Sequence, residues 1–240
     1  MGATRQATAH AKESVKALTR RLRFRRFSTV QLLIALALFF ICAPFVEEIK
    51  GSKLIFSVLL SLVLLSAIQA VSDRKYVLVI AIVLAIPAIA GRLMNDFWPD
   101  LVPPSVFLTA SIALIAFVVA YLLRFILRAP SVNTEVLCAS ISAYVMLGLM
   151  WALAYWLVDR LTPGGAFSFN TPTKTRSING LNGFYFSFIT LSTVGYGDIT
   201  PASPFARWLA TMEAMTGSLY VAVLIARLVA LYSGSKAPDS

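Results

Sequence analysis

Charged residues, histidine and cysteine are scarce in this sequence. Of its 240 residues only 13% are charged, one is histidine and two are cysteine, whereas 58% are hydrophobic. Soluble globular chains carry about 25% charged and roughly 45–50% apolar residues, so this composition does not fit an ordinary water-soluble domain. Cys42 and Cys138 both lie in apolar runs, where cysteine behaves as a small hydrophobic side chain. A disulfide framework is therefore excluded as the organising principle of the fold.

The same scarcity argues against an enzyme. The sequence has a single histidine, His10, and no Gly-x-Ser-x-Gly motif that could present a nucleophilic serine. The pair Gly195-x-Gly197 lacks the preceding strand and the third glycine of a dinucleotide-binding loop. We therefore expect a protein that is not an enzyme and that needs no cofactor.

Apolar runs of helical length predict six membrane-spanning helices, since one span takes about 20 mainly apolar residues. The runs cover residues 27–46, 54–71, 76–90, 105–127, 136–158 and 205–232. They are apolar on every side, as is typical of helices in lipid or inside a bundle. The third run is the least regular, because it is short and contains Pro87.

The positive charge predicts the orientation of these spans. The net charge is +10, and the basic residues are densest in residues 20–26. More basic residues follow in the second and fourth links and near the end of the chain, at Arg74, Lys75, Arg124, Arg128, Arg227 and Lys236. By the positive-inside rule this group is cytoplasmic, which predicts a multi-pass protein of the cell membrane with both termini inside. Anionic lipid headgroups are the expected partners of the basic N-terminal segment, and nucleic acid is not.

The segment between the fifth and sixth runs is too long for a turn and too mixed to cross the membrane. It begins with polar residues and continues in an apolar, aromatic run over residues 184–191, which Asn179 or Asn182 is placed to cap. A glycine-spaced stretch follows, Ser-Thr-Val-Gly-Tyr-Gly-Asp, over residues 192–198. A short helix followed by such a stretch predicts a re-entrant loop, because non-helical backbone at membrane depth needs water or protein around it.

Residues 190–198, Thr-Leu-Ser-Thr-Val-Gly-Tyr-Gly-Asp, resemble the selectivity filter of the tetrameric potassium-channel family, here of the six-span prokaryotic type. The resemblance implies a homotetramer that conducts K⁺ passively through a central pore. It also implies that K⁺ is held by the backbone carbonyls of Thr193, Val194, Gly195 and Tyr196, together with the Thr193 hydroxyl. Glycine at positions 195 and 197 permits backbone angles that a Cβ atom would disfavour.

The resemblance further implies which side chains support the filter. Val194 and Tyr196 would point away from the ions and pack on the pore helix, with Tyr185 and Phe186 as the expected partners. Asp198 would lie at the outer mouth of the filter. Ile189 is apolar where some relatives carry an acid, so a buried carboxylate partner for Asp198 is not expected at that position.

The sixth run is expected to be the inner helix that lines the pore. Gly217 is a candidate hinge, or else a site of close packing between helices. Glu213 either faces the cavity or hydrogen-bonds the back of its own pore helix, because a buried carboxylate needs water or a partner. Thr216 and Tyr220 could also face the cavity.

The expected fold is an all-α multi-pass membrane protein with a re-entrant pore helix and filter between the fifth and sixth spans. Its parts are a basic segment (1–26), a four-helix peripheral domain (27–130), a pore domain (131–232) and a short cytoplasmic tail (233–240). Residues 105–123 contain no basic residue, so we expect the channel not to sense voltage. Two alternatives remain: a non-conducting modulatory subunit, and a subunit of a channel-like potassium-uptake transporter.

Overall fold

The computed structural model describes residues 29–45, 52–71, 75–97, 103–170, 177–178 and 180–234. The basic segment 1–26, most of the predicted tail 233–240 and the possible capping residue Asn179 lie outside the described residues. The domain boundaries and the sides on which the termini lie stay predictions.

The described residues form mainly helices. They are a first helix Thr29–Phe45, α2 (Ser52–Val71), α3 (Lys75–Phe97), α4 (Pro104–Arg128), α5 (Thr134–Leu161), α6 (Gly180–Leu191) and α7 (Pro204–Gly234). Four of these, α3, α4, α5 and α7, are long and apolar enough to cross a membrane, whereas the first helix and α2 are apolar but shorter in their described parts. The protein is therefore a mostly helical membrane protein.

The structure differs from the sequence-based expectation in the length of one helix and in the presence of two strands. The helix α3 does not end near residue 90 but continues through Pro87 to Phe97, as apolar helices with packed neighbours tolerate a proline. A two-stranded antiparallel sheet, β1 (Phe167–Phe169) with β2 (Ile199–Pro201), also adds strands to a fold expected to be all-α.

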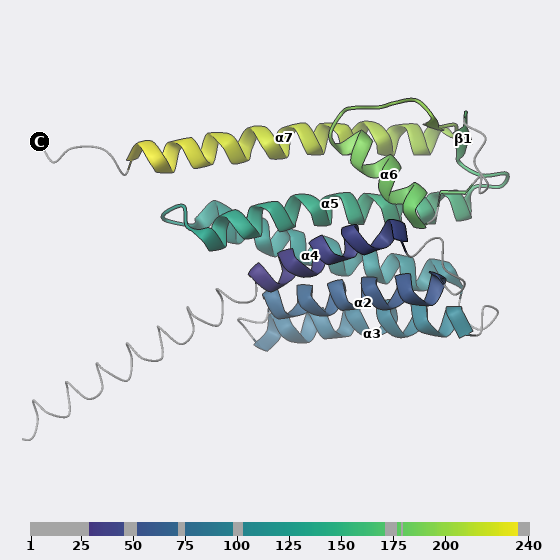
Figure 1. Cartoon of the computed structure of the whole chain (residues 1–240), viewed down its shortest axis with the longest axis horizontal. Helices are drawn as coiled ribbons and strands as arrows, with labels where there is room; N and C mark the ends of the chain where they lie inside the picture. Colours follow the sequence, from purple (N-terminus) through teal and green to yellow (C-terminus); the bar gives the residue numbers. More distant parts are fainter. Residues whose placement is uncertain are drawn as a thin grey trace, which may run out of the picture.

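The helix α5 lies at the centre of the fold. The first helix, α2, α3 and α4 lie on one side of it, and α7 lies on the other (Figure 1). A link of only five residues, 129–133, joins α4 to α5, and the Asn133 side chain caps α5 by accepting a hydrogen bond from the Val136 amide at 2.9 Å. This short link keeps the peripheral helices against the α5 of their own chain.

An aromatic cluster joins the peripheral helices to α6. Phe39 of the first helix and Phe56 of α2 contact the Phe184 ring with centroid distances of 5.3 and 5.5 Å. Phe40 meets Phe188 edge to face at 5.0 Å. Such aromatic pairs add about 0.5–1.5 kcal/mol each beyond area burial. The cluster was not predicted from the sequence, because its members come from three helices.

A buried cation lies next to this cluster. Arg92 of α3 is 5% exposed, and its Nε donates to Ser57 Oγ at 2.9 Å. Its guanidinium lies over the rings of Phe56 and Trp156, at 5.6 and 5.8 Å from their centroids. Cation–π contacts of this kind offset part of the cost of burying a charge. The extension of α3 beyond residue 90 is what brings Arg92 inside.

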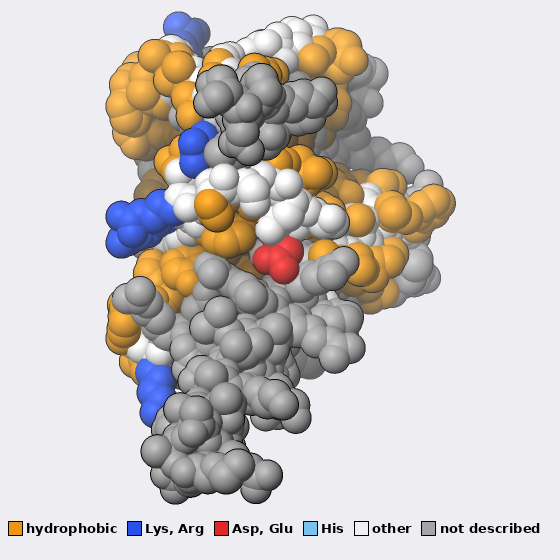
Figure 2. All heavy atoms as spheres, turned by 90° about the vertical axis from the view of Figure 1, so that its left-hand side faces the viewer, with side chains coloured by type: hydrophobic (Ala, Val, Ile, Leu, Met, Phe, Trp, Pro, Cys, Tyr) orange, Lys and Arg blue, Asp and Glu red, His pale blue; other side chains and the backbone are white. Residues whose placement is uncertain are grey.

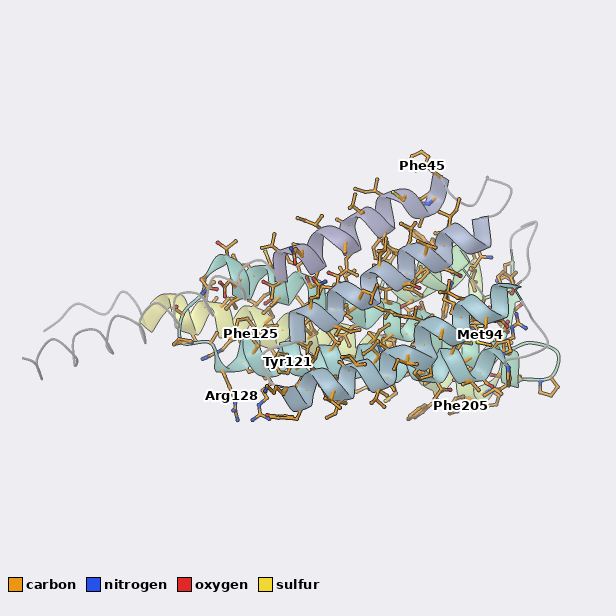
Figure 3. All side chains as sticks on the ribbon, turned by 90° about the horizontal axis from the view of Figure 1, so that it is seen from below. Phe45, Met94, Tyr121, Phe125, Arg128 and Phe205 are labelled. Atoms are coloured by element: carbon orange, nitrogen blue, oxygen red, sulfur yellow. The ribbon has the colours of Figure 1, made fainter. Side chains whose placement is uncertain are left out.

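One end of the molecule carries most of the described basic side chains that flank the long helices. The start of α3 and the end of α4 meet at this end, with Lys75, Arg124 and Arg128, and Arg227 lies toward it on α7. Figure 2 looks onto this end and shows separate basic side chains among hydrophobic ones, with one acidic patch. Arg128 projects outward there at the end of α4 (Figure 3).

Removing one ring from the aromatic cluster should destabilise the fold. Phe39 is 1% exposed, so Phe39→Ala is expected to lower the free energy of unfolding by about 3 kcal/mol through lost packing. The measurement is the temperature of unfolding of the purified protein in detergent, read as the loss of monodisperse protein on heating. Phe45, which is 72% exposed and projects outward (Figure 3), provides the matched control. Equal losses in Phe39→Ala and Phe45→Ala would contradict the packing described.

Candidate pore helix and filter

The helix α6 lies inclined between α5 and α7. It runs from the end of the molecule that carries β1 toward the middle, and the chain after it returns to that end (Figure 1). Asn182 is not its N-cap as proposed from the sequence, because it lies inside the first turn and its side chain donates to the Ser177 carbonyl at 3.1 Å. Gly183 is buried, and a Cβ there would lie 3.5 Å from the Ala152 carbonyl of α5. An added Cβ would make only ordinary van der Waals contact there, so a methyl group fits between the two helices.

The backbone after α6 alternates in handedness. Thr193, Gly195 and Gly197 have φ angles of 59°, 55° and 80°. Thr193 is the one non-glycine residue with positive φ among the described residues, which marks a conformation held by its surroundings. The amides of Val194 and Gly195 both donate to the Ile189 carbonyl, at 2.8 and 3.2 Å, so the stretch is anchored on the last turn of α6.

The carbonyls of residues 193–196 stay available. In the described part of the chain none of them accepts a hydrogen bond. A positive φ at every second residue turns successive peptide planes toward a common side, so this stretch can present its carbonyl oxygens together. These are the residues expected from the sequence to hold the ion.

The C-terminal end of the stretch is tied to the polar loop before α6. The Asn170 side chain donates to the Gly197 carbonyl at 2.9 Å, and its backbone amide donates to the Asp198 carbonyl at 2.8 Å. Asn170 directly follows β1, whose Phe169 pairs with Ile199 of β2. The Gly197 carbonyl is therefore occupied, unlike its four predecessors. Asn170 was missed from the sequence, where it sits in an unpatterned polar stretch.

Of the two predicted filter supports, Tyr185 lies near the stretch. Desolvation, and then the nearby Asp198 carboxylate, raise the pKa of Tyr185 to about 12, so this phenol stays protonated at neutral pH. The Phe186 ring packs on Tyr155 and Phe167, with centroid distances of 4.9 and 5.2 Å, so its role as a filter support stays a prediction. On a helix, neighbouring residues point to different faces, so Tyr185 and Phe186 meet different neighbours.

Val194 and Tyr196 have little cover from their own chain. Their exposed fractions are 52% and 72%. The sequence analysis expects both to pack on a pore helix, and the described residues of one chain do not supply that packing. Neighbouring apolar groups with this much exposure form a surface that lipid or another protein chain can cover.

Behind α6, Glu213 of α7 is completely buried. One carboxylate oxygen lies 2.5 Å from the Ser187 hydroxyl of α6, and the other accepts a hydrogen bond from the Tyr155 hydroxyl of α5. Of the two placements open from the sequence, the structure has the one at the back of α6, the candidate pore helix. Neither Ser187 nor Tyr155 was identified from the sequence, because they lie 26 and 58 residues from Glu213.

Gly217 lies one turn further along α7, directly against the end of α6. A Cβ atom at this position would lie 2.0 Å from the Leu191 carbonyl oxygen, so no side chain fits without moving one helix. Close packing, the second of the two sequence-based interpretations, accounts for this glycine. Glu213 and Gly217 thus hold α7 on α6 at two successive turns.

Thr216 and Tyr220 line one apolar hollow between α4, α5 and α7, and their expected place at a central pore cavity stays a prediction. The Tyr220 hydroxyl donates to the Ser140 carbonyl of α5 at 2.6 Å, and its ring lies against Tyr144. Thr216 donates to the Met212 carbonyl of its own helix at 2.7 Å. Tyr220 therefore joins α7 to α5, and Thr216 satisfies its hydroxyl locally.

Comparison with known proteins assigns the family. Residues 144–233, from the middle of α5 to the end of α7, match the family described as ion channel. Protein LctB of Geobacillus stearothermophilus is 31% identical, in an alignment that covers 40% of this chain and 83% of LctB. The chain belongs to the ion-channel family. The expectation that the protein is not an enzyme is thereby confirmed.

Two larger relatives are potassium channels by name. The inward rectifier potassium channel Kirbac3.1 of Paramagnetospirillum magnetotacticum is 31% identical over 38% of this chain and 27% of its own length. The two pore potassium channel c of Oryza sativa subsp. japonica is 32% identical over 36% of this chain and 19% of its own length. This ion channel therefore spans less than a third of either relative. The family match begins inside α5, so the peripheral helices lie outside it.

Adding a methyl group at Gly217 should force α7 away from α6. Gly217→Ala is expected to cost about 1–3 kcal/mol of stability by overpacking and to disturb the backbone after Leu191. The neighbouring Ser218 is exposed, so Ser218→Ala provides the control. Thermal unfolding of both variants measures the difference. If Gly217→Ala unfolds at the temperature of the control, the close approach to Leu191 is not present in solution.

Proposed function

We propose that this ion channel conducts K⁺ selectively and passively across the cell membrane, through a pore shared by four copies of the chain. The observation that carries the proposal is the alternating backbone of residues 193–197, whose first four carbonyls accept no hydrogen bond within the described chain. Rings of backbone carbonyls that replace the hydration shell are how potassium filters hold the ion.

The need for several copies follows from the geometry of one chain. A single stretch offers one column of carbonyls, whereas a dehydrated ion needs oxygens on every side. Closed rotational symmetry places identical columns around one axis. The exposed Val194 and Tyr196 side chains then have a partner, since the pore helix of a neighbouring copy can cover them. The names of the potassium-channel relatives support the choice of K⁺ as the ion.

For the membrane arrangement we propose six spans with α6 and the filter re-entering from the outer side. The four long helices account for four spans, and the apolar first helix and α2 account for the other two. The end of the molecule with Lys75, Arg124 and Arg128 is the cytoplasmic end by the positive-inside rule. The chain after α6 then lies near the outer end, together with Asn170 and Asp198.

The channel is proposed to be insensitive to voltage. Residues 104–123 of α4 contain no basic residue, and Arg124 and Arg128 follow only at its end. A charge that crosses the whole field contributes about 2.3 kcal/mol per 100 mV, and steep gating needs several charges in each subunit. Arg92, the one buried basic side chain in the described ranges, cannot supply them. We expect a conductance that varies little with voltage in symmetric K⁺, and a steeply sigmoidal curve would contradict this.

Selectivity provides the test of the function. Purified protein in lipid vesicles or planar bilayers, under opposed K⁺ and Na⁺ gradients, should give currents that reverse near the K⁺ equilibrium potential. Gly195 has a φ of 55°, so Gly195→Ala strains the filter and should abolish this selectivity. Gly164, which also has positive φ but lies in the loop before β1, provides the control as Gly164→Ala.

Two outcomes would overturn the function. The absence of current in the wild type would favour a modulatory or transporter subunit. Unchanged K⁺ selectivity in Gly195→Ala would show that ions are selected elsewhere.

A further inference from the structure

Three short oxygen–oxygen contacts surround the buried Glu213 side chain. Tyr155 Oη and Ser187 Oγ each contact one of its carboxylate oxygens, the second at 2.5 Å. Ser187 Oγ also lies 2.7 Å from the backbone carbonyl of Gly148 on α5. The four groups thus form one unbroken chain in the order Tyr155, Glu213, Ser187, Gly148.

Counting protons along this chain decides the charge of Glu213. Each of the three contacts needs one proton, but the two hydroxyl groups of Tyr155 and Ser187 supply only two. With an ionised carboxylate, one of the two contacts of Ser187 Oγ would bring two acceptor oxygens together without a hydrogen. A proton on Glu213 satisfies all three contacts. Tyr155 then donates to Glu213, Glu213 donates to Ser187, and Ser187 donates to the Gly148 carbonyl.

The surroundings of Glu213 favour the neutral form as well. The side chain is 0% exposed and lies on a helix long and apolar enough to cross the membrane. An ionised carboxylate at such a place is costly without a cation beside it. Among the described residues no basic side chain interacts with it, and its partners are the Ser187 and Tyr155 hydroxyls.

We infer that Glu213 is a neutral carboxylic acid whose proton completes a hydrogen-bond chain, and that this chain positions the pore helix α6 between α5 and α7. Glu213 is a positioning residue, since it acts on the filter through α6 and does not itself contact the ion. The functional part of this inference rests on the proposed potassium-channel function.

The route from Glu213 to the filter is short. Ser187 lies two residues before Ile189 on α6. The Ile189 carbonyl accepts hydrogen bonds from the Val194 and Gly195 amides. On the next turn of α7, Gly217 touches the last carbonyl of α6, at Leu191. A shift of α6 relative to α7 therefore moves the anchor of the filter backbone. Hydrogen-bonded chains in a dry site reinforce each other, so losing one member loosens the whole chain.

Substitution of Glu213 by glutamine and by leucine distinguishes a neutral carboxylic acid from an ionised carboxylate. In Glu213→Gln the amide N–H can donate to Ser187 and the amide oxygen can accept from Tyr155, which reproduces the bonds of a neutral acid. Glu213→Leu has similar bulk but no hydrogen bonds. If the carboxylate were ionised in the native protein, glutamine would remove a required charge and would fail together with leucine.

Infrared spectroscopy tests the proton without using ion conduction. In the full-length wild type in lipid at neutral pH, we expect the C=O stretching band of a protonated carboxylic acid. The band should disappear in Glu213→Gln and persist in Glu135→Gln, a control at the partly exposed start of α5. A wild-type spectrum without a band that depends on Glu213 would overturn the inference.

Flux measurements test the positioning role. K⁺ flux into vesicles should be retained in Glu213→Gln and should fall about tenfold in Glu213→Leu, as expected for broken buried hydrogen bonds. Ser187→Ala should also reduce the flux, whereas Ser140→Ala should not, because the buried Ser140 hydroxyl bonds only its own helix at Val136. Equal losses in the glutamine and leucine variants, or none in either, would contradict the role.

The two proposals fail in different ways. If the wild type carries no K⁺ flux, the proposed function is wrong, and the infrared band still decides whether Glu213 holds a proton. If the wild type conducts and the band is absent, the function stands and the assignment of Glu213 is wrong. Should Glu213→Leu not assemble, the infrared band and Glu213→Gln still give an answer.

Discussion

The arrangement of the candidate filter depends on the contacts that hold the C-terminal end of the short helix α6 in place. The helix α6 ends at Leu191 inside the molecule, and the next residues continue as non-helical backbone. Backbone of this kind is tolerated at membrane depth only where protein or water satisfies it. Here the amides after α6 turn back onto the Ile189 and Thr190 carbonyls, which leaves the next carbonyls free. The support for α6 is therefore also the support for the proposed ion site.

That support comes from three directions. On the α5 side, the Phe188 ring fits over Gly148, where a Cβ would lie 2.5 Å from the ring. On the α7 side, Glu213 and Gly217 contact Ser187 and Leu191. The third side is covered by the phenylalanines of the first helix and α2. The peripheral helices thus contact α6 of their own chain directly, so a movement of these helices can reach the proposed filter through packing.

Local patterns explain what could be predicted from the sequence. Apolar runs of helical length predicted the positions of the helices. The glycine spacing after an aromatic run marked residues 193–197, whose backbone angles agree with the expected need for glycine. The packing partners of individual side chains were harder to predict, because the hydrophobic pattern along one helix does not show which other helix it packs on. Phe186 and Tyr185 are adjacent in the sequence but have different neighbours, Tyr155 and Asp198 respectively. The hydrogen-bond partners of Glu213 lie on two other helices. Asn170 is positioned by the pairing of two three-residue strands, which are too short to show an alternating hydrophobic pattern in the sequence.

The most direct test of the central claim is a cryo-electron microscopy map of the full-length protein in lipid nanodiscs with K⁺. The account predicts four copies around one axis, with ion density on that axis between the carbonyls of residues 193–196. It also predicts that a neighbouring copy covers Val194 and Tyr196. A particle with another number of copies, or with residues 193–196 far from the symmetry axis, would contradict it.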